Sequence, residues 1–205
     1  MSNISIIGTG NMARTIGALA VAGGNTVEVI GRDQSKAAEL AKALGGSTTT
    51  GEFGAVPAGD IVIVALGYAN VVPVVAQYGN ALAGKVIVDI CNPVNSTGDG
   101  LAIPDGTSIA QNVAGAAPAS ASVVKAFNTT FGAVLAKGQP LDVFIAGDDP
   151  DAKATVAELA RDGGLNPIDA GPLKRARELE AMGLLHMTLQ GTLGTGFSSA
   201  IRIVA

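Results

Sequence analysis

Two glycines near the start of the chain have the spacing that a dinucleotide pyrophosphate requires. Gly8, Gly10 and Ala13 form Gly-x-Gly-x-x-Ala after the apolar run 4–7, and apolar residues then recur at helical spacing. Gly8 permits a tight turn, Gly10 has no Cβ to obstruct a phosphate, and Ala13 allows close helix packing. The helix N-terminus would direct free N–H groups at the phosphates. Five consecutive residues are therefore candidate cofactor ligands: Gly8, Thr9, Gly10, Asn11 and Met12.

The end of the second predicted strand, residues 26–30, indicates which dinucleotide binds. NAD enzymes usually carry an Asp or Glu there for the ribose 2′-hydroxyl, whereas this chain has Gly31 and Arg32. Arg32 can pair with a 2′-phosphate and stack on adenine. Ser35 and Lys36 could complete the phosphate pocket. The sequence therefore predicts NADP as the cofactor.

Two carboxylates leave the choice between NAD and NADP open, and the basic residues also have a simpler interpretation. Glu28 lies inside the predicted strand, too early to reach the ribose. Asp33 lies just past the strand, and a later strand end would make it a ribose ligand and NAD the cofactor. Arg32 and Lys36 taken alone could also belong to a solvated turn and helix face.

Composition favours a compact α/β protein of the cytoplasm. The chain has 205 residues, of which 48% are hydrophobic and 15% charged, so one substantial core is available. The single cysteine excludes an internal disulfide, and no apolar run approaches the length of a membrane span. The formal net charge of −4 argues against nucleic acid as a partner. We expect a soluble, untargeted protein without a membrane partner.

Strand and helix patterns alternate along the rest of the chain, which predicts one doubly wound Rossmann domain, residues 1–205, with a mostly parallel sheet. Further predicted strands are residues 47–50, 60–66, 85–90, 122–127, 142–147, 166–170 and 198–204. Predicted helices after the first are residues 35–44, 71–78, 108–116, 128–135, 150–163 and a long one at 173–193. The segment 93–119 reads as a long loop around its short helix, and it could cover a ligand. Residues 171–205 would contribute to an acceptor site or to dimerisation.

Several of these pieces together resemble a known family. They are Gly8-Thr9-Gly10-Asn11-Met12, Gly31-Arg32 with Ser35-Lys36, Asn92-Pro93, residues 124–129 (Val-Lys-Ala-Phe-Asn-Thr), and residues 169–173 (Asp-Ala-Gly-Pro-Leu) leading into 176–180. The chain resembles, over nearly its whole length, the NADPH-dependent reductases of the deazaflavin coenzyme F420 and their relatives, which include the reductase domain of the STEAP metalloreductases. The resemblance implies hydride transfer between NADPH and a stacked deazaflavin or flavin ring, and a homodimer.

Strand ends and the loops that follow them are expected to converge on the nicotinamide, since ligands of such sheets bind at the carboxyl ends of the strands. The candidate residues are Ala65, Leu66, Gly67, Asn92, Pro93, Ala126 and Asn128. Asn92-Pro93 could instead be only a loop start, and Asn128 could cap the helix predicted at 128–135. The small side chains and backbone groups of this set would suit flat rings.

A constellation for acid–base chemistry is not visible in the sequence. Reduction of a carbonyl usually needs a positioned proton donor, whereas hydride transfer between planar rings needs mainly orientation in a dry pocket. We therefore assign no catalytic side chain and no metal ligand. His186, the single histidine, falls on the apolar stripe of the long helix and is interpreted as packed, and Cys91 as a buried, inert thiol.

Other interpretations remain. Lys174, Arg175 and Arg177 are expected on a solvated face, although an acidic acceptor tail could use them. The first alternative function is reduction of a small carbonyl or imine, but such enzymes add a helical substrate domain that one long helix cannot supply. The second is a non-catalytic NADP(H)-binding redox sensor, because binding and turnover share one pocket.

Overall fold

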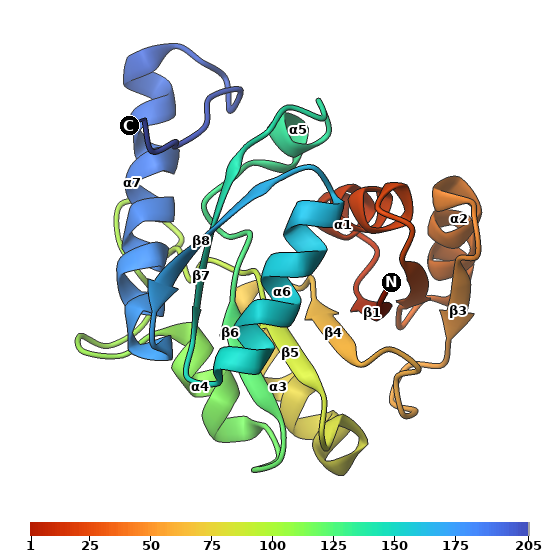
Figure 1. Cartoon of the computed structure of the whole chain (residues 1–205). Coiled ribbons are helices and arrows are strands. Elements are labelled where there is room, and N and C mark those ends of the chain that lie inside the picture. Colours follow the sequence, from red (N-terminus) through yellow and green to blue (C-terminus); the bar gives the residue numbers. More distant parts are fainter. Residues whose placement is uncertain (205) are drawn as a thin grey trace.

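One 8-stranded sheet, covered by helices on both faces, forms the centre of the part of the chain that the structure describes (Figure 1). The structure is a computed structural model, and it describes residues 1–204. The strands are β1 (Asn3–Ile7), β2 (Thr26–Ile30), β3 (Thr49–Gly51), β4 (Ile61–Val64), β5 (Val86–Asp89), β6 (Ser122–Lys125), β7 (Asp142–Gly147) and β8 (Asn166–Gly171). They lie in the order β3-β2-β1-β4-β5-β6-β7-β8, so the doubly wound α/β fold expected from the sequence is confirmed.

The sheet is parallel except at one place. β6 and β7 pair antiparallel, with Lys125 opposite Ala146, while β7 and β8 are parallel to each other. β7 and β8 therefore run against all the other strands, and their carboxyl ends lie at the opposite edge of the sheet. This reversal was not predicted, because the strand sequences themselves do not differ in kind from those of parallel strands.

Helices on the two faces enclose separate parts of the core. Their bounds are α1 (Asn11–Ala22), α2 (Gln34–Leu44), α3 (Tyr68–Tyr78), α4 (Ile109–Ala116), α5 (Gly132–Leu135), α6 (Pro150–Asp162) and α7 (Ala176–Leu193), with short 3-10 turns η1 (Gly79–Leu82) and η2 (Leu173–Arg175). In β4, Ile61 and Ile63 join the core beneath α1, α2 and α6, whereas Val62 and Val64 join the core beneath α3 and α4. A strand buried on both faces needs such a continuous apolar run.

Helix ends follow the local chemistry of the sequence. Asp33 caps α2 by accepting hydrogen bonds from the N–H groups of Ser35 and Lys36. Asp149 caps α6 in the same way, with Pro150 in the first turn, where its missing N–H is not needed. These two starts lie within a residue of the predicted ones.

Two predicted elements are wrong. No strand is present in residues 198–204; Phe197 and the glycines at 194 and 196 have positive φ, which interrupts an extended chain, and the Ile203 N–H is bound by the Asp142 carboxylate at 2.6 Å. The helix predicted at 128–135 begins only at Gly132. Asn128 does not cap it, because its side-chain amide bonds to other elements instead.

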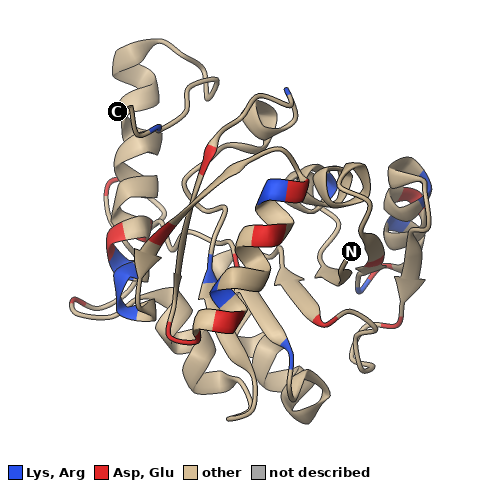
Figure 2. Cartoon of the chain, in the orientation of Figure 1, with Lys and Arg blue, Asp and Glu red and all other residues tan. Residues whose placement is uncertain are grey.

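Charged residues are spread over many elements (Figure 2). In this view the basic residues form no continuous stripe, and the clearest group lies where α7 begins, at Lys174, Arg175 and Arg177. Within residues 1–204, no helix is both long and apolar enough to cross a membrane.

Candidate functional site

The carboxyl ends of β1 and β4 adjoin at the point where the chain connections diverge to either side of the sheet. The Gly8 N–H donates to the Ile30 carbonyl at 2.8 Å, and the Ala65 N–H donates to the Ile7 carbonyl at 2.9 Å. Gly8 has φ +135°, and a Cβ there would overlap the Ala65 carbonyl. Gly8 is therefore required by the fold itself.

Gly10 differs from Gly8, because a Cβ added there would meet no protein atom within 4 Å. It is the N-cap of α1, and no side chain caps this helix. The first hydrogen bond of the helix is donated by the Arg14 N–H to the Gly10 carbonyl, so the preceding N–H groups have no partner within the helix. Ala13 is fully buried, as its packing place in the motif requires.

A first cavity, of about 210 Å³, lies beside the Gly8 turn and the end of β2. Its lining includes Gly8, Thr9, Gly31, Arg32, Asp33, Lys36, Phe53 and Leu66. No carboxylate among residues 1–204 lies within ion-pair distance of Arg32. Lys36 Nζ is 3.8 Å from Asp33 Oδ2, and both side chains are largely exposed. One arginine and one lysine against one aspartate leave this cavity cationic, which suits a phosphate.

The two acidic residues that left the choice between NAD and NADP open, Glu28 and Asp33, are hydrogen-bonded to other groups of the protein. Glu28 lies within β2, as predicted, and its Oε2 accepts from Ser5 Oγ at 2.6 Å and from the Ala58 N–H at 2.9 Å. Asp33 Oδ1 is bound to the first N–H groups of α2. Ser35 does not line the cavity, and its N–H donates to Asp33.

A second cavity, of about 290 Å³, lies at the ends of β5 and β6. It is lined by Met12, Ile90, Asn92, Phe127, Asn128, Thr130, Phe131, Gly132, Met187 and Phe197. A reciprocal amide contact joins two of these residues: Asn92 Nδ2 donates to the Asn128 carbonyl at 2.7 Å, and Asn128 Nδ2 donates to Asn92 Oδ1 at 2.8 Å. Asn128 Nδ2 also donates to the Leu179 carbonyl of α7.

The structure divides the predicted site residues into three groups. Gly8, Thr9, Arg32, Lys36 and Leu66 line the first cavity, and Met12, Asn92 and Asn128 line the second. Gly10, Asn11, Ser35, Ala65, Gly67, Pro93 and Ala126 line neither. Ala126 is fully buried in the core, because the residue after Lys125 turns its side chain to the face covered by α1. Ala65 is nevertheless the residue whose carbonyl restricts Gly8.

Sequence reasoning missed most of the aromatic lining. The chain has 5 phenylalanines, and Phe127, Phe131 and Phe197 line the second cavity while Phe53 lines the first. In a chain with so few aromatic residues, their types were a usable signal. The convergence of these phenylalanines on the cavities could not be predicted, because Phe197 follows the last helix and is far from the others in sequence.

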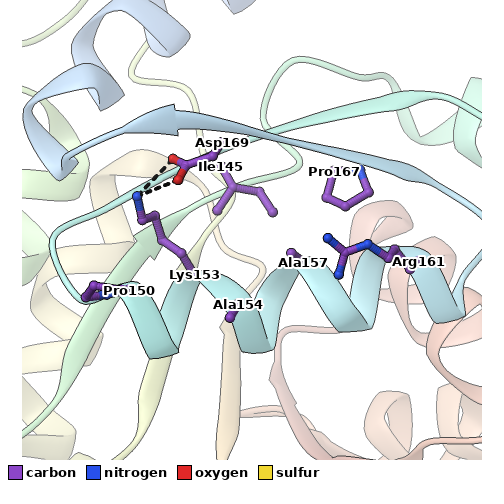
Figure 3. A pocket seen from close by; sticks show the side chains of 8 residues that line it. All are labelled: Ile145, Pro150, Lys153, Ala154, Ala157, Arg161, Pro167 and Asp169. Atoms are coloured by element: carbon purple, nitrogen blue, oxygen red, sulfur yellow. Dashed lines mark hydrogen bonds and ion pairs between the residues drawn. The ribbon is translucent and has the colours of Figure 1, made fainter.

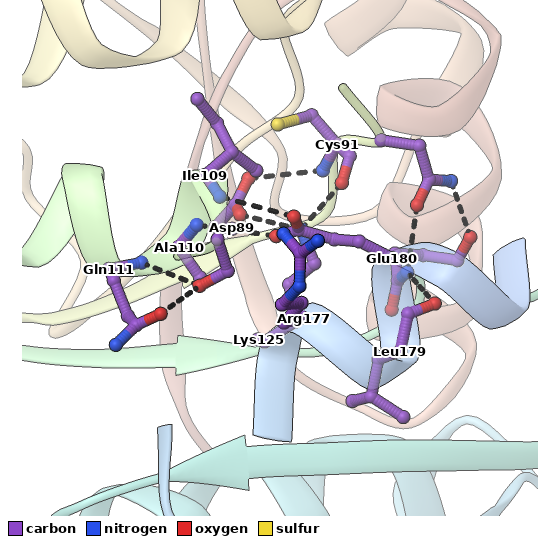
Figure 4. Close-up of polar contacts among 12 residues, drawn as sticks. Asp89, Cys91, Ile109, Ala110, Gln111, Lys125, Arg177, Leu179 and Glu180 are labelled. Carbon is purple, nitrogen blue, oxygen red and sulfur yellow. Dashed lines mark hydrogen bonds and ion pairs between the residues drawn. The ribbon is translucent and has the colours of Figure 1, made fainter. Parts of the chain in front are cut away.

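A cluster of buried charges joins Asp89 of β5, Lys125 of β6 and Glu180 of α7 (Figure 4). Lys125 Nζ is 2.7 Å from Asp89 Oδ2, 3.0 Å from Glu180 Oε1 and 2.5 Å from the Cys91 carbonyl. All three charged side chains are completely buried. Glu180 also accepts from the first N–H groups of α4, at Ile109 and Ala110. The cluster therefore ties β5, β6, α4 and α7 together.

Burial and neighbouring charges determine how these groups titrate. Burial alone would lower the pKa of Lys125, but the Asp89 and Glu180 carboxylates outweigh it and raise that pKa above its usual value. Burial raises the pKa of Glu180, although Lys125 opposes the shift. Burial, reinforced by Asp89, raises the pKa of the Cys91 thiol well above its usual range. Cys91 is thus a buried thiol kept protonated, as predicted.

His186 is packed, as its position on the helix predicted. It is 5% exposed and stacks on Phe131, with ring centroids 4.5 Å apart. Its Nδ1 lies 3.3 Å from the Thr129 carbonyl and its Nε2 2.9 Å from Ser199 Oγ. The ring therefore supports Phe131 from behind, and it is not part of either cavity lining.

Arg177 does not belong to a freely solvated face, contrary to expectation. Its guanidinium pairs with Asp105 at 2.8 Å and donates to the carbonyls of Pro104 and Thr107. These contacts fasten the segment before α4 to the start of α7.

A further hollow, of about 300 Å³, lies between α6 and the β7–β8 pair (Figure 3). Lys153 and Asp169 form a two-point ion pair at one end, at 2.8 and 2.9 Å, and Arg161 lies at the other end. None of the predicted site residues lines it. It is therefore separate from the site at the strand ends.

The residues at the strand ends fit a bound dinucleotide in three respects. The space beside Gly10 is open, the N-terminus of α1 has no side-chain cap, and the buried Oδ1 of Asn128 has no hydrogen-bond partner within residues 1–204. An unpaired buried acceptor is costly, and a donor such as a carboxamide N–H would remove that cost.

Comparison with known sequences agrees with this geometry. A family model described as NADP oxidoreductase, coenzyme F420-dependent, matches residues 3–93. Residues 3–93 of this chain are therefore similar to that family. The matched region contains the Gly8 turn, Arg32, the ends of β4 and β5, and Asn92.

Relatives extend the similarity beyond that region. The chain is 35% identical over 185 residues to metalloreductase STEAP3 of Rattus norvegicus, which covers 88% of this chain and 36% of the relative. It is 34% identical over 132 residues to the F420-dependent NADP reductase of Methanocaldococcus jannaschii, covering 60% of this chain and 59% of the relative. The chain therefore spans about a third of the first relative and about three fifths of the second.

A solved structure has the same fold over the whole length. A crystal structure from Arthrobacter sp. FB24, provisionally named an F420-dependent NADP reductase, superposes with a TM-score of 0.87 at 25% identity. The comparison covers 100% of both chains. The C-terminal part, residues 94–204, thus also has a structural counterpart in that protein.

Proposed function

We propose that this protein is an NADPH-dependent oxidoreductase whose hydride acceptor is a deazaflavin or flavin ring. The observation that supports it most directly is the pair of cavities at one edge of the sheet, one cationic and one apolar and aromatic. The family match and the names of the relatives support the same cofactor.

The cofactor would lie across the ends of β1 and β4. Arg32 and Lys36 would bind the 2′-phosphate, and the free N–H groups at the start of α1 would bind the pyrophosphate beside Gly10. The unpaired Oδ1 of Asn128 would accept a hydrogen bond from the nicotinamide carboxamide. Bound NADPH would supply a hydride, and the acceptor would take up that hydride together with one proton from water.

The chain's own contribution to the reaction would be orientation and the exclusion of water. Among the residues that line the second cavity there is no His, Lys, Tyr or carboxylate to act as a proton donor. Its thioether and phenyl side chains form an apolar surface suited to a flat ring. This chemistry favours a planar acceptor over a small carbonyl or imine.

Steady-state oxidation of NADPH tests the proposal. Turnover with a deazaflavin, FMN or both is the expected result, measured by the loss of NADPH absorbance. Turnover confined to a small carbonyl or imine would contradict it. Tight NADPH binding without turnover on any acceptor would instead indicate a redox sensor.

We also propose that a second copy of the chain packs against α7. Leu185, Leu189 and Leu193 follow one another at four-residue spacing on this helix, and all three side chains are exposed. Light scattering of the purified protein should give the mass of a dimer, and Leu189→Lys should shift it to that of a monomer.

A further inference from the structure

The segment that follows α7 folds back to the second cavity and forms part of its wall. Phe197 lines the cavity and is 49% exposed, so much of its ring remains free to contact a ligand. Its ring packs edge-on against Phe131, with centroids 5.1 Å apart and an interplanar angle of 77°. Phe131 is itself supported by His186. The wall is thus a connected aromatic group rather than a loose loop.

The backbone at this wall is in an unfavourable conformation. Within residues 1–204, the non-glycine residues with positive φ are Phe127, at 59°, and Phe197, at 61°, and both line this cavity. Bulky side chains rarely adopt this conformation, and it persists only where the surroundings impose it. Such residues cluster at ligand sites, where the cost secures a side-chain position.

Gln190 imposes the conformation of the segment. This side chain of α7 is 4% exposed, and its Oε1 accepts from Thr195 Oγ1 at 2.5 Å, from the Phe197 N–H at 3.1 Å and from Ser199 Oγ at 3.1 Å. Its Nε2 donates to the His186 carbonyl at 2.7 Å. One buried amide therefore fixes the residues on both sides of Phe197 to the helix.

We propose that Phe197 is a specificity-determining residue that contacts a planar acceptor, and that Gln190 is its positioning residue. The inference rests on the proposed function, since it places the acceptor in the second cavity. A cavity of about 290 Å³ is near the lower limit for small-molecule sites, so a flat ring held against an aromatic wall fits it better than a bulky substrate. Ring-to-ring contact also supplies selectivity for flat molecules without a hydrogen-bonding motif.

Equilibrium binding of two planar probes tests this role without requiring turnover. FMN and a 5-deazaflavin are titrated, by fluorescence, into protein saturated with NADP⁺. Phe197→Ala should raise the Kd of both probes about tenfold, the loss typical of one aromatic contact, and should leave the Kd of NADP⁺ unchanged. Phe197→Tyr keeps the ring and should bind like the wild type.

Gln190→Met removes the acceptor of three hydrogen bonds with little change in side-chain length. It should raise the Kd of both probes and the KM of the acceptor, with little effect on kcat and none on the Kd of NADP⁺. Thr192→Ala is the matched control, because Thr192 lies on the same helix, is exposed, and does not line the cavity. This variant should bind the probes as the wild type does.

The outcomes separate this inference from the proposed function. If the wild type binds neither probe, or if Phe197→Ala binds both as well as the wild type, the role of Phe197 is overturned. If the wild type binds the probes and loses affinity in Phe197→Ala but never oxidises NADPH, the role of Phe197 stands and the proposed reaction fails.

Discussion

Gly8 and Gly10, two residues apart, are required for different reasons. Gly8→Ala would place a Cβ against the Ala65 carbonyl at a φ that alanine avoids, so it should lower the free energy of unfolding by about 2 kcal/mol or more. Gly10→Ala meets no protein atom, and its φ of −82° suits any residue. It should leave urea unfolding unchanged and weaken NADPH binding at least tenfold, on the order of one lost phosphate contact. Equal unfolding midpoints for the two variants would contradict this distinction.

Arg32 is expected to set the preference between the two nicotinamide cofactors. Arg32 lines the first cavity and has no carboxylate within ion-pair distance among residues 1–204, so it is available to a 2′-phosphate. Arg32→Ala should raise the Kd of NADPH by about ten- to thirtyfold, the range for one charge-assisted contact, and should barely change that of NADH. Calorimetry with both cofactors measures this. A wild type that binds both equally would favour Asp33 as a ribose ligand instead.

Local chemistry made part of the site predictable at the level of residues. The Gly8 turn lies within the β1–α1–β2 unit, and Arg32 and Lys36 follow directly after β2, so their spacing alone places them together. Ala126 was misplaced because strand residues alternate between faces, and a shift of one position reverses the side chain. Phe131 and Phe197 could not be paired, since only the course of α7 brings them together.

The contact between β5, β6 and α7 depends on the buried charges of Lys125, Asp89 and Glu180. Lys125→Met would leave two buried carboxylates without their cation, and we expect a loss of about 3–5 kcal/mol in the free energy of unfolding. Lys153→Met is the matched control, because it removes a lysine–aspartate pair whose Asp169 is 63% exposed. That change should cost less than about 1 kcal/mol. Urea unfolding of both variants compares them, and similar losses would refute the structural role of the buried cluster.

Elements were predictable where their own residues determine them. Apolar runs located β4 and β5, and the cap at Asp149 located α6, within one or two residues. A lysine within the apolar run of β6 was a signal for a buried partner, but Glu180 lies in another element and could not be identified. The segment 198–204 has strand-forming residues without a neighbouring strand to pair with, and composition alone cannot supply that neighbour.

The whole molecule should become less stable in acid, chiefly at the β7–β8 end of the sheet. Hydrogen bonds from Asn166 and the Ile203 N–H lower the pKa of Asp142, and a bond from Lys153 lowers that of Asp169. Each carboxyl therefore binds protons less readily in the folded state than in the unfolded state. Their contribution is complete above the ordinary carboxyl pKa of about 4, and it is lost as the pH falls through the lower folded values.

Urea unfolding between pH 7 and pH 3 measures this dependence. Asp142→Asn should make the decline with falling pH shallower, because one of the responsible carboxyls is gone. The pH dependence of stability that Glu180 contributes has the opposite sign. Because its pKa is raised in the folded state, its stabilising contribution is lost as the pH rises through that pKa. An unchanged pH dependence in Asp142→Asn would show that Asp142 is not among the groups responsible.

The reversed direction of β7 and β8 affects the order in which the two cavities can be completed during synthesis of the chain. Because β8 ends at the far edge, α7 must run the height of the sheet before Phe197 can reach the second cavity (Figure 1). Leu66 is the last residue in sequence order that lines the first cavity. A ribosome adding about 5–20 residues per second would therefore synthesise all residues of the first cavity on the order of ten seconds before it adds Phe197. A nascent chain would hold the parts for binding NADPH well before it could shield the nicotinamide from water.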